Sequence, residues 1–210
     1  MFGLRNERLF AVDQLPPVMS LTAGVVAVQG DVSEHAAAIE SAAAAHGESA
    51  EVVEIRESGI VPECDLLSIP GGESTTISRL LAREGIDEEV KAHVAEGKPL
   101  LATCAGLIVA SSDANDDRVE TLDLLDVSVQ RNAFGRQRDS FEADLDVDGL
   151  TEPFHAVFIR APVIDEVGDA EVLASWDGRP VAVRDGPVLG TSFHPELTGD
   201  SRVHDLAFFE

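Results

Sequence analysis

The pattern of apolar and polar positions predicts strands that alternate with helices along the first half of the chain. Residues 24–29 (GVVAVQ) form an apolar, β-branched run that is typical of a buried strand. The alanine-rich segment 34–46 is typical of a helix, which Ser33 can cap and Gly47 can end. Strands that alternate with helices indicate a parallel sheet covered on both faces.

The pattern changes at about residue 111. Before it, further strands are expected at 51–55, 65–69 and 98–103, and further helices at 73–83, 86–96 and 105–111. After it, short strands dominate, at 127–130, 141–147, 156–160, 171–174, 181–184 and 188–193, before a last helix at 203–210. We therefore predict an α/β fold, a three-layer α/β/α sandwich with a mostly parallel central sheet.

The chain is expected to contain one domain. Residues 19–210 show no internal repeat and no linker. Residues 1–18 end in two prolines and have no clear period. We interpret them as an N-terminal extension, either a loose arm or a misassigned start ahead of Met19.

The charge of the chain narrows the classes of partner. The 39 acidic and 15 basic residues give a formal net charge of −24, spread in patches such as 113–117 and 142–148. So negative a field repels nucleic acid and anionic membranes, and neither is an expected partner. We interpret it as a hydrated surface suited to high salt. Only 2 cysteines, and no apolar run near the ~20 residues of a membrane helix, favour a soluble, cytoplasmic protein.

Cys104 follows one of the predicted strands and precedes a helix that Gly106 allows to pack closely. A nucleophile on such a turn is exposed at the edge of the sheet, and the helix N-terminus favours a thiolate. The N–H of Ala105 could then face a developing oxyanion. The same stretch also fits a small buried core residue, because free cysteine is often buried.

His194 and Glu196 lie two residues apart, on either side of Pro195. Pro195 favours an extended conformation before it, so both side chains are expected on one side and Glu196 can orient the imidazole. The other ring nitrogen could face Cys104 and complete a nucleophilic triad. A loop histidine beside a solvated glutamate, or two metal ligands, would have the same spacing, but no third ligand is evident and no metal is expected. The other histidines lack such a setting; they are at 35, 46, 93, 155 and 204.

The tripeptide 70–72 (PGG) stands between a predicted strand and a predicted helix. Backbone N–H groups exposed there can hold an anion or a carbonyl oxygen. An ordinary turn capped by Ser74 or Thr75 fits as well, whereas the G-x-x-x-x-G-K pattern of a phosphate loop is absent. This segment, Cys104 and His194 all follow predicted strands, at the edge where open α/β sheets place their sites. Together they indicate acyl transfer from an amide.

Six segments resemble the triad-type, class I glutamine amidotransferases and, more closely, the glutaminase subunits of pyridoxal 5′-phosphate synthase. They are PGGESTT (70–76), TCAGLI (103–108), RNAFGRQ (131–137), DSFEAD (139–144), FIRAP (158–162) and SFHPELT (192–198). The loop VQGD (28–31) and the pair EH (34–35) fit too, and the resemblance runs from about residue 22 to the end. RNAFGRQ together with PGGEST and FHPELT is specific to that subunit among its relatives.

The resemblance implies a class I glutamine amidotransferase-like fold and hydrolysis of L-glutamine to L-glutamate and ammonia, without a cofactor. Cys104 would attack the carboxamide and form a thioester. His194 would activate the thiol and then protonate the departing ammonia, while Glu196 would hold His194. Residue 102 is alanine where the family commonly has glycine, a change that could tighten the turn at the nucleophile.

Further roles are implied by the same resemblance. The glutamine-contacting positions would be Gly72, Glu73, Ser74, Arg131, Ile159 and Arg160. An arginine suits the substrate α-carboxylate, which it can bind bidentately. The oxyanion hole would use the backbone at Gly72 and Ala105, with Gln29 helping to complete it once a partner docks. That partner would be the synthase subunit, a dodecameric core that carries twelve glutaminase subunits and condenses the ammonia with a pentose phosphate and a triose phosphate.

Three alternatives stay open. A glutaminase of another pathway, such as the histidine-pathway amidotransferase, is disfavoured by RNAFGRQ. A stand-alone cysteine hydrolase or glyoxalase-like member of a related fold would not predict the C-terminal His-x-Glu. A non-catalytic subunit that binds glutamine and the synthase is disfavoured by the intact triad.

Overall fold

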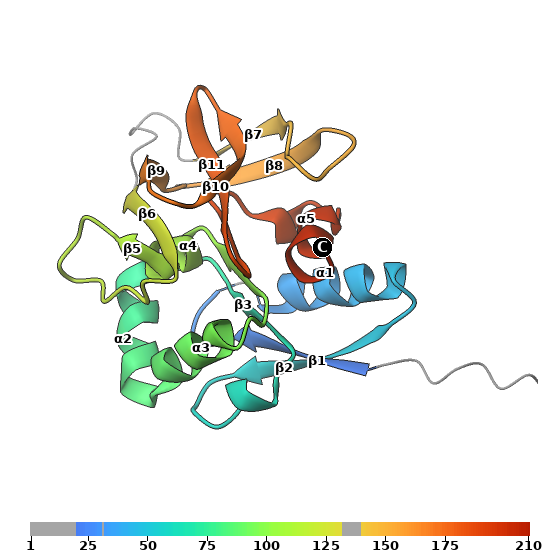
Figure 1. The fold of residues 1–210 in the computed structure, drawn as a ribbon, viewed down its shortest axis with the longest axis vertical. Coiled ribbons are helices and arrows are strands. Elements are labelled where there is room, and N and C mark those ends of the chain that lie inside the picture. Colours follow the sequence, from blue (N-terminus) through green and yellow to red (C-terminus); the bar gives the residue numbers. More distant parts are fainter. Residues whose placement is uncertain (1–19, 31, 132–139) are drawn as a thin grey trace, which may run out of the picture.

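The computed structural model describes residues 20–30, 32–131 and 140–210 (Figure 1). Four expectations therefore lie wholly or partly outside the described residues: the extension at 1–18 with its boundary at Met19, the end of the VQGD loop at Asp31, residues 132–137 of RNAFGRQ, and Asp139 at the start of DSFEAD.

A seven-stranded sheet forms the centre of the fold, in the order β10-β11-β12-β4-β3-β1-β2. Its strands are β1 (Ser20–Val26), β2 (Ser49–Ile55), β3 (Leu66–Ile69), β4 (Leu100–Thr103), β10 (Glu171–Trp176), β11 (Arg179–Asp185) and β12 (Val188–Thr191). All neighbouring pairs from β12 to β2 are parallel, whereas β11 pairs antiparallel with both of its neighbours, β10 and β12, at one edge of the sheet. The predicted mostly parallel sheet is confirmed.

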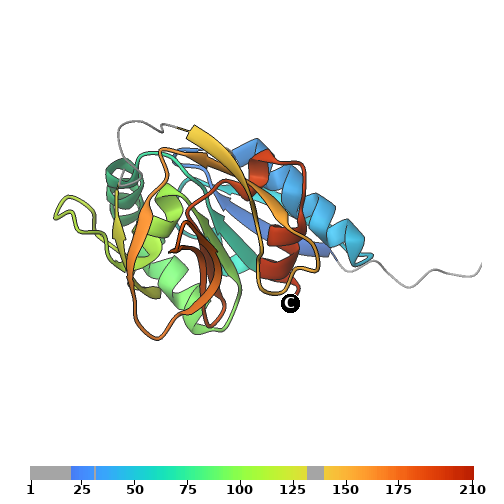
Figure 2. The ribbon, with the colours of Figure 1, turned by 90° about the horizontal axis from the view of Figure 1, so that it is seen from above.

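Helices cover both faces of this sheet (Figures 1 and 2). One face carries α1 (Val32–Ala45) and α5 (Arg202–Phe208), and the other carries α2 (Ser74–Glu84), α3 (Ile86–Ala95) and α4 (Ala105–Ala110). Alternate side chains of β4 serve the two faces, because strand side chains point to opposite sides. Leu100 and Ala102 join the core under α2–α4, whereas Leu101 joins the core that contains Phe158 and Phe193. A strand buried on both faces reads as a continuous apolar run, which is how the sequence indicated three layers.

The second half adds strands that flank the sheet. β5 (Ser111–Asp113), β6 (Leu125–Gln130) and β9 (Val163–Val167) form a small sheet, and β7 (Ser140–Leu145) and β8 (Phe154–Ile159) form a hairpin. Two 3₁₀ helices, η1 (Val61–Glu63) and η2 (Pro195–Leu197), complete the description. No described helix has the length and apolar character needed to cross a membrane.

Several predicted boundaries were wrong, and one of them bears on the site. β1 ends at Val26 rather than at Gln29, and it begins at Ser20 rather than at Gly24. Residues 27–29 therefore leave the sheet at its carboxyl edge, where a side chain can reach the neighbouring loop after β3. β5 and β9 were not expected at all; β5 is only 3 residues long and β9 buries only Val163 and Ile164.

Candidate active site

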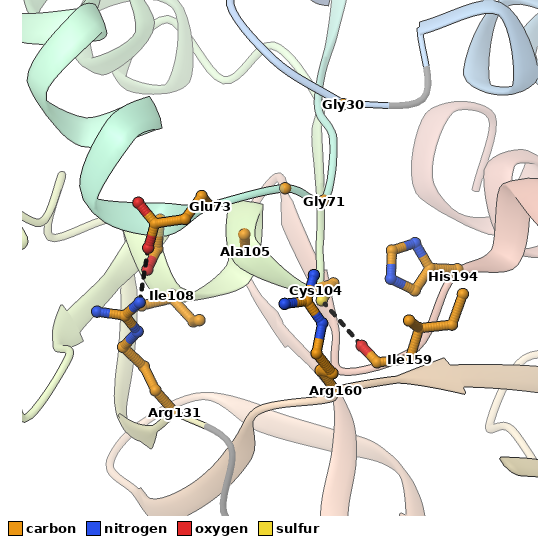
Figure 3. Close-up of a pocket in the computed structure, with 12 residues that line it drawn as sticks. Gly30, Gly71, Glu73, Cys104, Ala105, Ile108, Arg131, Ile159, Arg160 and His194 are labelled. Carbon is orange, nitrogen blue, oxygen red and sulfur yellow. Dashed lines mark hydrogen bonds and ion pairs between the residues drawn. The ribbon is translucent and has the colours of Figure 1, made fainter. Parts of the chain in front are cut away.

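Three adjacent parallel strands end at one place on the sheet. β12 pairs with β4 up to Thr191 and Thr103, and β4 pairs with β3 up to Ala102 and Ile69. The PGG turn, Cys104 and the His194 segment follow these strand ends, so the three segments that the sequence singled out lie side by side (Figure 3). The parallel topology alone brings residues together that are far apart in the chain.

Cys104 stands on a sharp turn between β4 and α4. Its φ of 51° and ψ of −104° are unusual for a residue with a side chain, and its N–H donates a hydrogen bond to the carbonyl of Thr191 at 2.8 Å. Gly106 allows the turn, because a Cβ there would lie 2.1 Å from the carbonyl oxygen of Ile69. Cys104 is 7% exposed, and its Sγ lies 3.8 Å from the carbonyl oxygen of Ile159. The thiol is therefore held at the surface of a cavity and is not packed in the core.

His194 is oriented by Glu196, although not in the way the sequence predicted. The segment is not extended: His194 has a φ of −106° and a ψ of 88°, and Glu196 lies in η2, which begins at Pro195. His194 Nδ1 and Glu196 Oε1 are 2.7 Å apart, and both side chains are almost completely buried. The His194 N–H donates to the carbonyl of Val157 on β8, which fixes the segment.

The surroundings of His194 favour its charged form. Burial disfavours the imidazolium, but contacts with Cys104 and Glu196 outweigh this effect and raise the pKa of His194. A thiolate–imidazolium pair is the arrangement that makes cysteine nucleophilic. The described residues hold no cluster of three or more histidine, cysteine or acidic side chains suited to a metal ion.

A cavity of about 340 Å³ opens in front of Cys104 (Figure 3). Nine of the residues that the sequence analysis proposed line it: Gly72, Glu73, Ser74, Cys104, Ala105, Arg131, Ile159, Arg160 and His194. Ser74 is buried, and its Oγ has no hydrogen-bond partner among the described residues. A buried hydroxyl without a partner is costly, so this group is available to a polar ligand in the cavity.

Gln29, in the loop after β1, lies beside Gly72 in the turn after β3. The Gln29 Oε1 accepts a hydrogen bond from the N–H of Glu73 at 2.9 Å. Gly72 has a φ of +145°, which favours glycine, and a Cβ there would lie 3.2 Å from Gln29 Oε1. The side chain of Gln29 therefore touches the proposed oxyanion turn, without lining the cavity itself.

Glu73 has a structural task at this turn. Its carboxylate accepts from the N–H of Thr76 and caps α2, so the capping residue is not Ser74 or Thr75. A hydrogen bond from the Thr75 hydroxyl, joined by those from Thr76 and by the charge of Arg131, lowers the pKa of Glu73 to about 2. The carboxylate is therefore ionised at neutral pH.

Arg131 is held by two carboxylates at the rim of the cavity. Its guanidinium lies 2.7 Å from Glu73 Oε1 and 2.6 Å from Asp116 Oδ2. Hydrogen bonds from Arg118 hold the pKa of Asp116 well below its usual range. The sequence pattern predicts surface charge at residues 113–117 and gives no sign of the contact between Asp116 and Arg131. The residue type gave no signal, because most aspartates in this chain are solvated.

His35 was also missed. It is fully buried on α1, and its Nε2 lies 3.5 Å from Glu196 Oε2, on the side away from His194. His35 is 161 positions before Glu196 in the chain, so the packing of α1 against η2 brings the two together.

Comparison with known proteins supports the same chemistry. The model of the SNO glutamine amidotransferase family matches residues 25–210. A protein of Halobacterium salinarum named "Pyridoxal 5'-phosphate synthase subunit PdxT" is 79% identical over 91% of this chain and 95% of its own length. Proteins of the same name from Haloarcula marismortui and Methanothrix thermoacetophila are 75% and 54% identical, over 91% and 87% of this chain and 98% and 96% of their own lengths.

Solved structures share the architecture. A crystal structure described as a glutamine amidotransferase has a TM-score of 0.78 and 45% sequence identity, and the match covers 88% of this chain and 96% of that one. The PurLQS structure from Thermotoga maritima has a TM-score of 0.56 at 18% identity, covering 89% of this chain and 92% of that one. The second likeness shows the fold alone.

Proposed function

The chain belongs to the SNO glutamine amidotransferase family, and from this premise we propose that Cys104, His194 and Glu196 hydrolyse L-glutamine through a thioester. The protein is the glutaminase subunit of a pyridoxal 5′-phosphate synthase, as its relatives at 79% and 75% identity are named. The assignment of the residues rests on one observation above all. The thiol on the turn after β4 and the His194–Glu196 pair after β12 lie at neighbouring strand ends, and Cys104 and His194 face one cavity.

The chemistry proceeds in two displacements at one carbon. The thiolate of Cys104 attacks the carboxamide carbon, and the carbonyl electrons move onto oxygen. When the carbonyl re-forms, the C–N bond breaks, and the nitrogen leaves as ammonia with a proton from the His194 imidazolium. Water then attacks the thioester, giving a proton to the neutral His194, and glutamate leaves as the C–S bond breaks. Glu196 keeps the His194 ring in position through Nδ1 in both halves.

The oxyanion of both steps needs hydrogen-bond donors. Ala105 is the first residue of α4, so its N–H has no acceptor within the helix and is free to donate. The backbone at Gly72 lies across the cavity, and Gln29 holds that turn by accepting from the N–H of Glu73. We assign the oxyanion hole to Ala105 and Gly72, with Gln29 as the group that sets the turn when the synthase subunit docks.

The glutamine backbone binds at the outer part of the cavity. The two cationic side chains there, Arg131 and Arg160, suit the α-carboxylate, and the ionised Glu73 suits the α-ammonium group. The Oγ of Ser74, buried without a partner among the described residues, can take one further polar contact. Ile159 closes the wall beside Cys104 and offers the apolar surface for the side-chain methylenes.

The protein works with a synthase subunit. We assign the natural complex to twelve glutaminase subunits on a dodecameric core, within the cytoplasm, where the two free cysteines Cys64 and Cys104 stay reduced. Residues 19–210 act as the glutaminase domain, and residues 1–18 are an extension that the chemistry does not need.

The deciding experiment measures ammonia release from glutamine in multimolar KCl, for the chain alone and with its cognate synthase subunit. We expect marked activation by the synthase, and loss of activity in Cys104→Ala. Cys64→Ala is the matched control, because it removes the other buried cysteine, which packs in the core under α2–α4. Equal rates with and without the synthase would remove the docking mechanism. Folded protein without activity in either case would make the chain a glutamine-binding subunit.

A further inference from the structure

Glu196 has one oxygen that the triad does not use. Its Oε1 contacts Nδ1 of His194 at 2.7 Å, whereas its Oε2 is buried and has no hydrogen bond within normal geometry among the described residues. A buried carboxylate oxygen without a partner is costly, because the charge has left water. Nε2 of His35 lies 3.5 Å from this oxygen.

His35 belongs to a buried polar cluster between α1, β3, β4 and α5. Its Nδ1 lies 3.1 Å from His204 Nε2 and 3.1 Å from Ser68 Oγ, and its Nε2 lies 3.2 Å from Thr103 Oγ1. All four side chains are completely buried. Burial, aided by the neighbouring His204 and His194, lowers the pKa of His35 well below its ordinary value, and burial lowers the pKa of His204 to about 3. Both rings are therefore neutral at pH 7, and each carries one N–H.

The position of these two protons follows from counting the unsatisfied groups. If His35 carried its proton on Nδ1, it would donate to His204, which would then have a buried N–H on Nδ1 with no acceptor among the described residues. The lone pair of His35 Nε2 would also face the anionic Glu196 Oε2. If both protons are on Nε2, His204 donates to His35, and the Nε2–H of His35 faces two acceptors, Thr103 Oγ1 at 3.2 Å and the anionic Glu196 Oε2 at 3.5 Å. Only the lone pair of His204 Nδ1 then stays without a partner, so the second arrangement is favoured.

We propose that His35 is a positioning residue that holds the second oxygen of Glu196 through its Nε2–H, and that His204 fixes the tautomer that makes this possible. The proposal rests on the glutaminase chemistry assigned to Cys104. A chain of contacts then runs from His204 through His35, Glu196 and His194 to the thiol. With this donor in place Glu196 is held turned toward His194; without it the carboxylate can turn away from the ring.

Two variants at one position separate this role from simple packing. His35→Met fills a similar volume without a donor, and His35→Gln places an amide N–H near the position of Nε2. We expect His35→Met to lower kcat about 10- to 100-fold with the synthase present, with KM for glutamine nearly unchanged. The acid limb of kcat/KM should move to higher pH, because a displaced Glu196 supports the thiolate–imidazolium pair less. His35→Gln should recover most of the rate and the original limb.

The titratable groups around Glu196 determine how the pH profile is interpreted. They are His194 on its own segment, His35 from α1, and His204 from α5 behind His35; Glu34 and Asp200 border the groove outside Glu196. The control is His93→Met. His93 is a buried histidine on α3, and its Nε2 lies 3.2 Å from the carbonyl oxygen of Pro99. The variant His93→Met should have a lower free energy of unfolding, while the acid limb of its kcat/KM profile stays where it is in wild type. Identical kcat and acid limb in His35→Met and His93→Met would overturn the proposal.

Two further readouts do not depend on glutamine turnover. Mass spectrometry of the Cys104 peptide gives the rate of alkylation by iodoacetamide at each pH. The pH at which this rate rises should be higher in His35→Met than in wild type, and unchanged in His93→Met. In wild-type protein labelled with ¹⁵N-histidine, His35 and His204 should both show neutral rings protonated on Nε2 at pH 7. A His35 proton on Nδ1 would overturn the proposal even if His35→Met did not fold. Wild-type protein that alkylates as expected but releases no ammonia with the synthase would instead contradict the proposed function.

Discussion

A methyl group on Gly71 would lie 2.5 Å from Cε1 of His194 and 3.4 Å from Cβ of Cys104. A side chain at position 71 would therefore enter the space that the imidazole ring of His194 occupies. The turn after β3 and the triad thus fit together by the absence of one side chain, in addition to their hydrogen bonds.

Gly71→Ala should damage catalysis more than stability. The new Cβ must push the His194 ring away from its position between Cys104 and Glu196, and we expect kcat to fall about 100-fold or more. Gly24→Ala is the matched control, because its Cβ would meet only core side chains, 2.6 Å from Ile55 Cδ1 and 2.6 Å from Leu67 Cδ2. That variant should lose about 1–3 kcal/mol of unfolding free energy and keep its kcat. Steady-state kinetics and denaturant unfolding on both variants check this, and a Gly71→Ala enzyme with normal kcat would contradict it.

The backbone at Cys104 should show that the nucleophile is placed at a cost in stability. Its φ of 51° and ψ of −104° are a conformation that glycine adopts more easily than alanine does. Cys104→Gly should therefore unfold at higher denaturant concentration than Cys104→Ala, with a difference of about 1 kcal/mol, while both release no ammonia. An alanine variant as stable as the glycine variant would show that the turn is not strained.

Arg131 should need its two-armed guanidinium. Arg131→Lys cannot hold Glu73 and Asp116 together in the same way, and we expect KM for glutamine to rise about tenfold, which is about 1.4 kcal/mol. Arg118→Lys is the control, because Arg118 contacts the same Asp116 but its side chain is 75% exposed. Initial-rate kinetics with the synthase present compare the two. An equal change in both variants would assign the effect to Asp116 and not to the substrate side of Arg131.

Stability should fall in mild acid because of His204. Burial lowers its pKa to about 3, so below about pH 6.5 the unfolded chain binds a proton there that the folded chain does not. The folded state therefore loses about 1.4 kcal/mol per pH unit through this group as pH falls from about 6.5. In His204→Phe this loss is absent, so the stability gap between wild type and variant should narrow by about 2 kcal/mol between pH 7 and pH 5.

The opposite pH dependence of the unfolding free energy is expected for His155, which therefore gives a control for the same series of unfolding measurements. Hydrogen bonds from its ring to Asp144 and Glu142 raise the pKa of His155, so its contribution is present in acid and is lost as pH rises through that pKa. The difference in unfolding free energy between wild type and His155→Gln should therefore become larger in acid. A difference in unfolding free energy between wild type and His204→Phe that is constant with pH would show that His204 takes up a proton as readily in the folded chain as in the unfolded one.

Salt should stabilise the folded chain. With a net charge of −24, like charges repel across the whole surface, and added ions screen this repulsion. The thermal unfolding midpoint should rise from low to multimolar KCl, as suits a chain whose relatives come from Halobacterium and Haloarcula. Equal midpoints at both salt concentrations would show that the acidic surface does not set the salt requirement.

The parts of the site that the sequence predicted are those with local signals. Cys104 and the PGG turn follow short strands that are buried on both faces, and such strands read as unbroken apolar runs. The parallel order of β3, β4 and β12 then dictates that their ends meet. The pairing of His194 with Glu196 was also expected from spacing, although the prediction of an extended segment was wrong, because Pro195 starts a 3₁₀ turn instead.

The parts that the sequence did not predict depend on tertiary packing. His35 contacts Glu196 only because α1 packs beside η2 and α5, and no pattern near residue 35 announces this. Asp116 stands among solvated acidic residues and differs from them only by the position of Arg131. β5 is polar and 3 residues long, so its pairing with β6 is visible only in the folded sheet.

The order of the elements along the chain also sets the order in which the parts of the site are synthesised. The ribosome makes Cys104 before it makes β12, and His194 and Glu196 follow β12. A growing chain therefore carries Cys104 long before it carries His194, the base of the proposed mechanism. Under that mechanism the thiol is not activated until β12 joins β4, so incomplete chains would not consume glutamine.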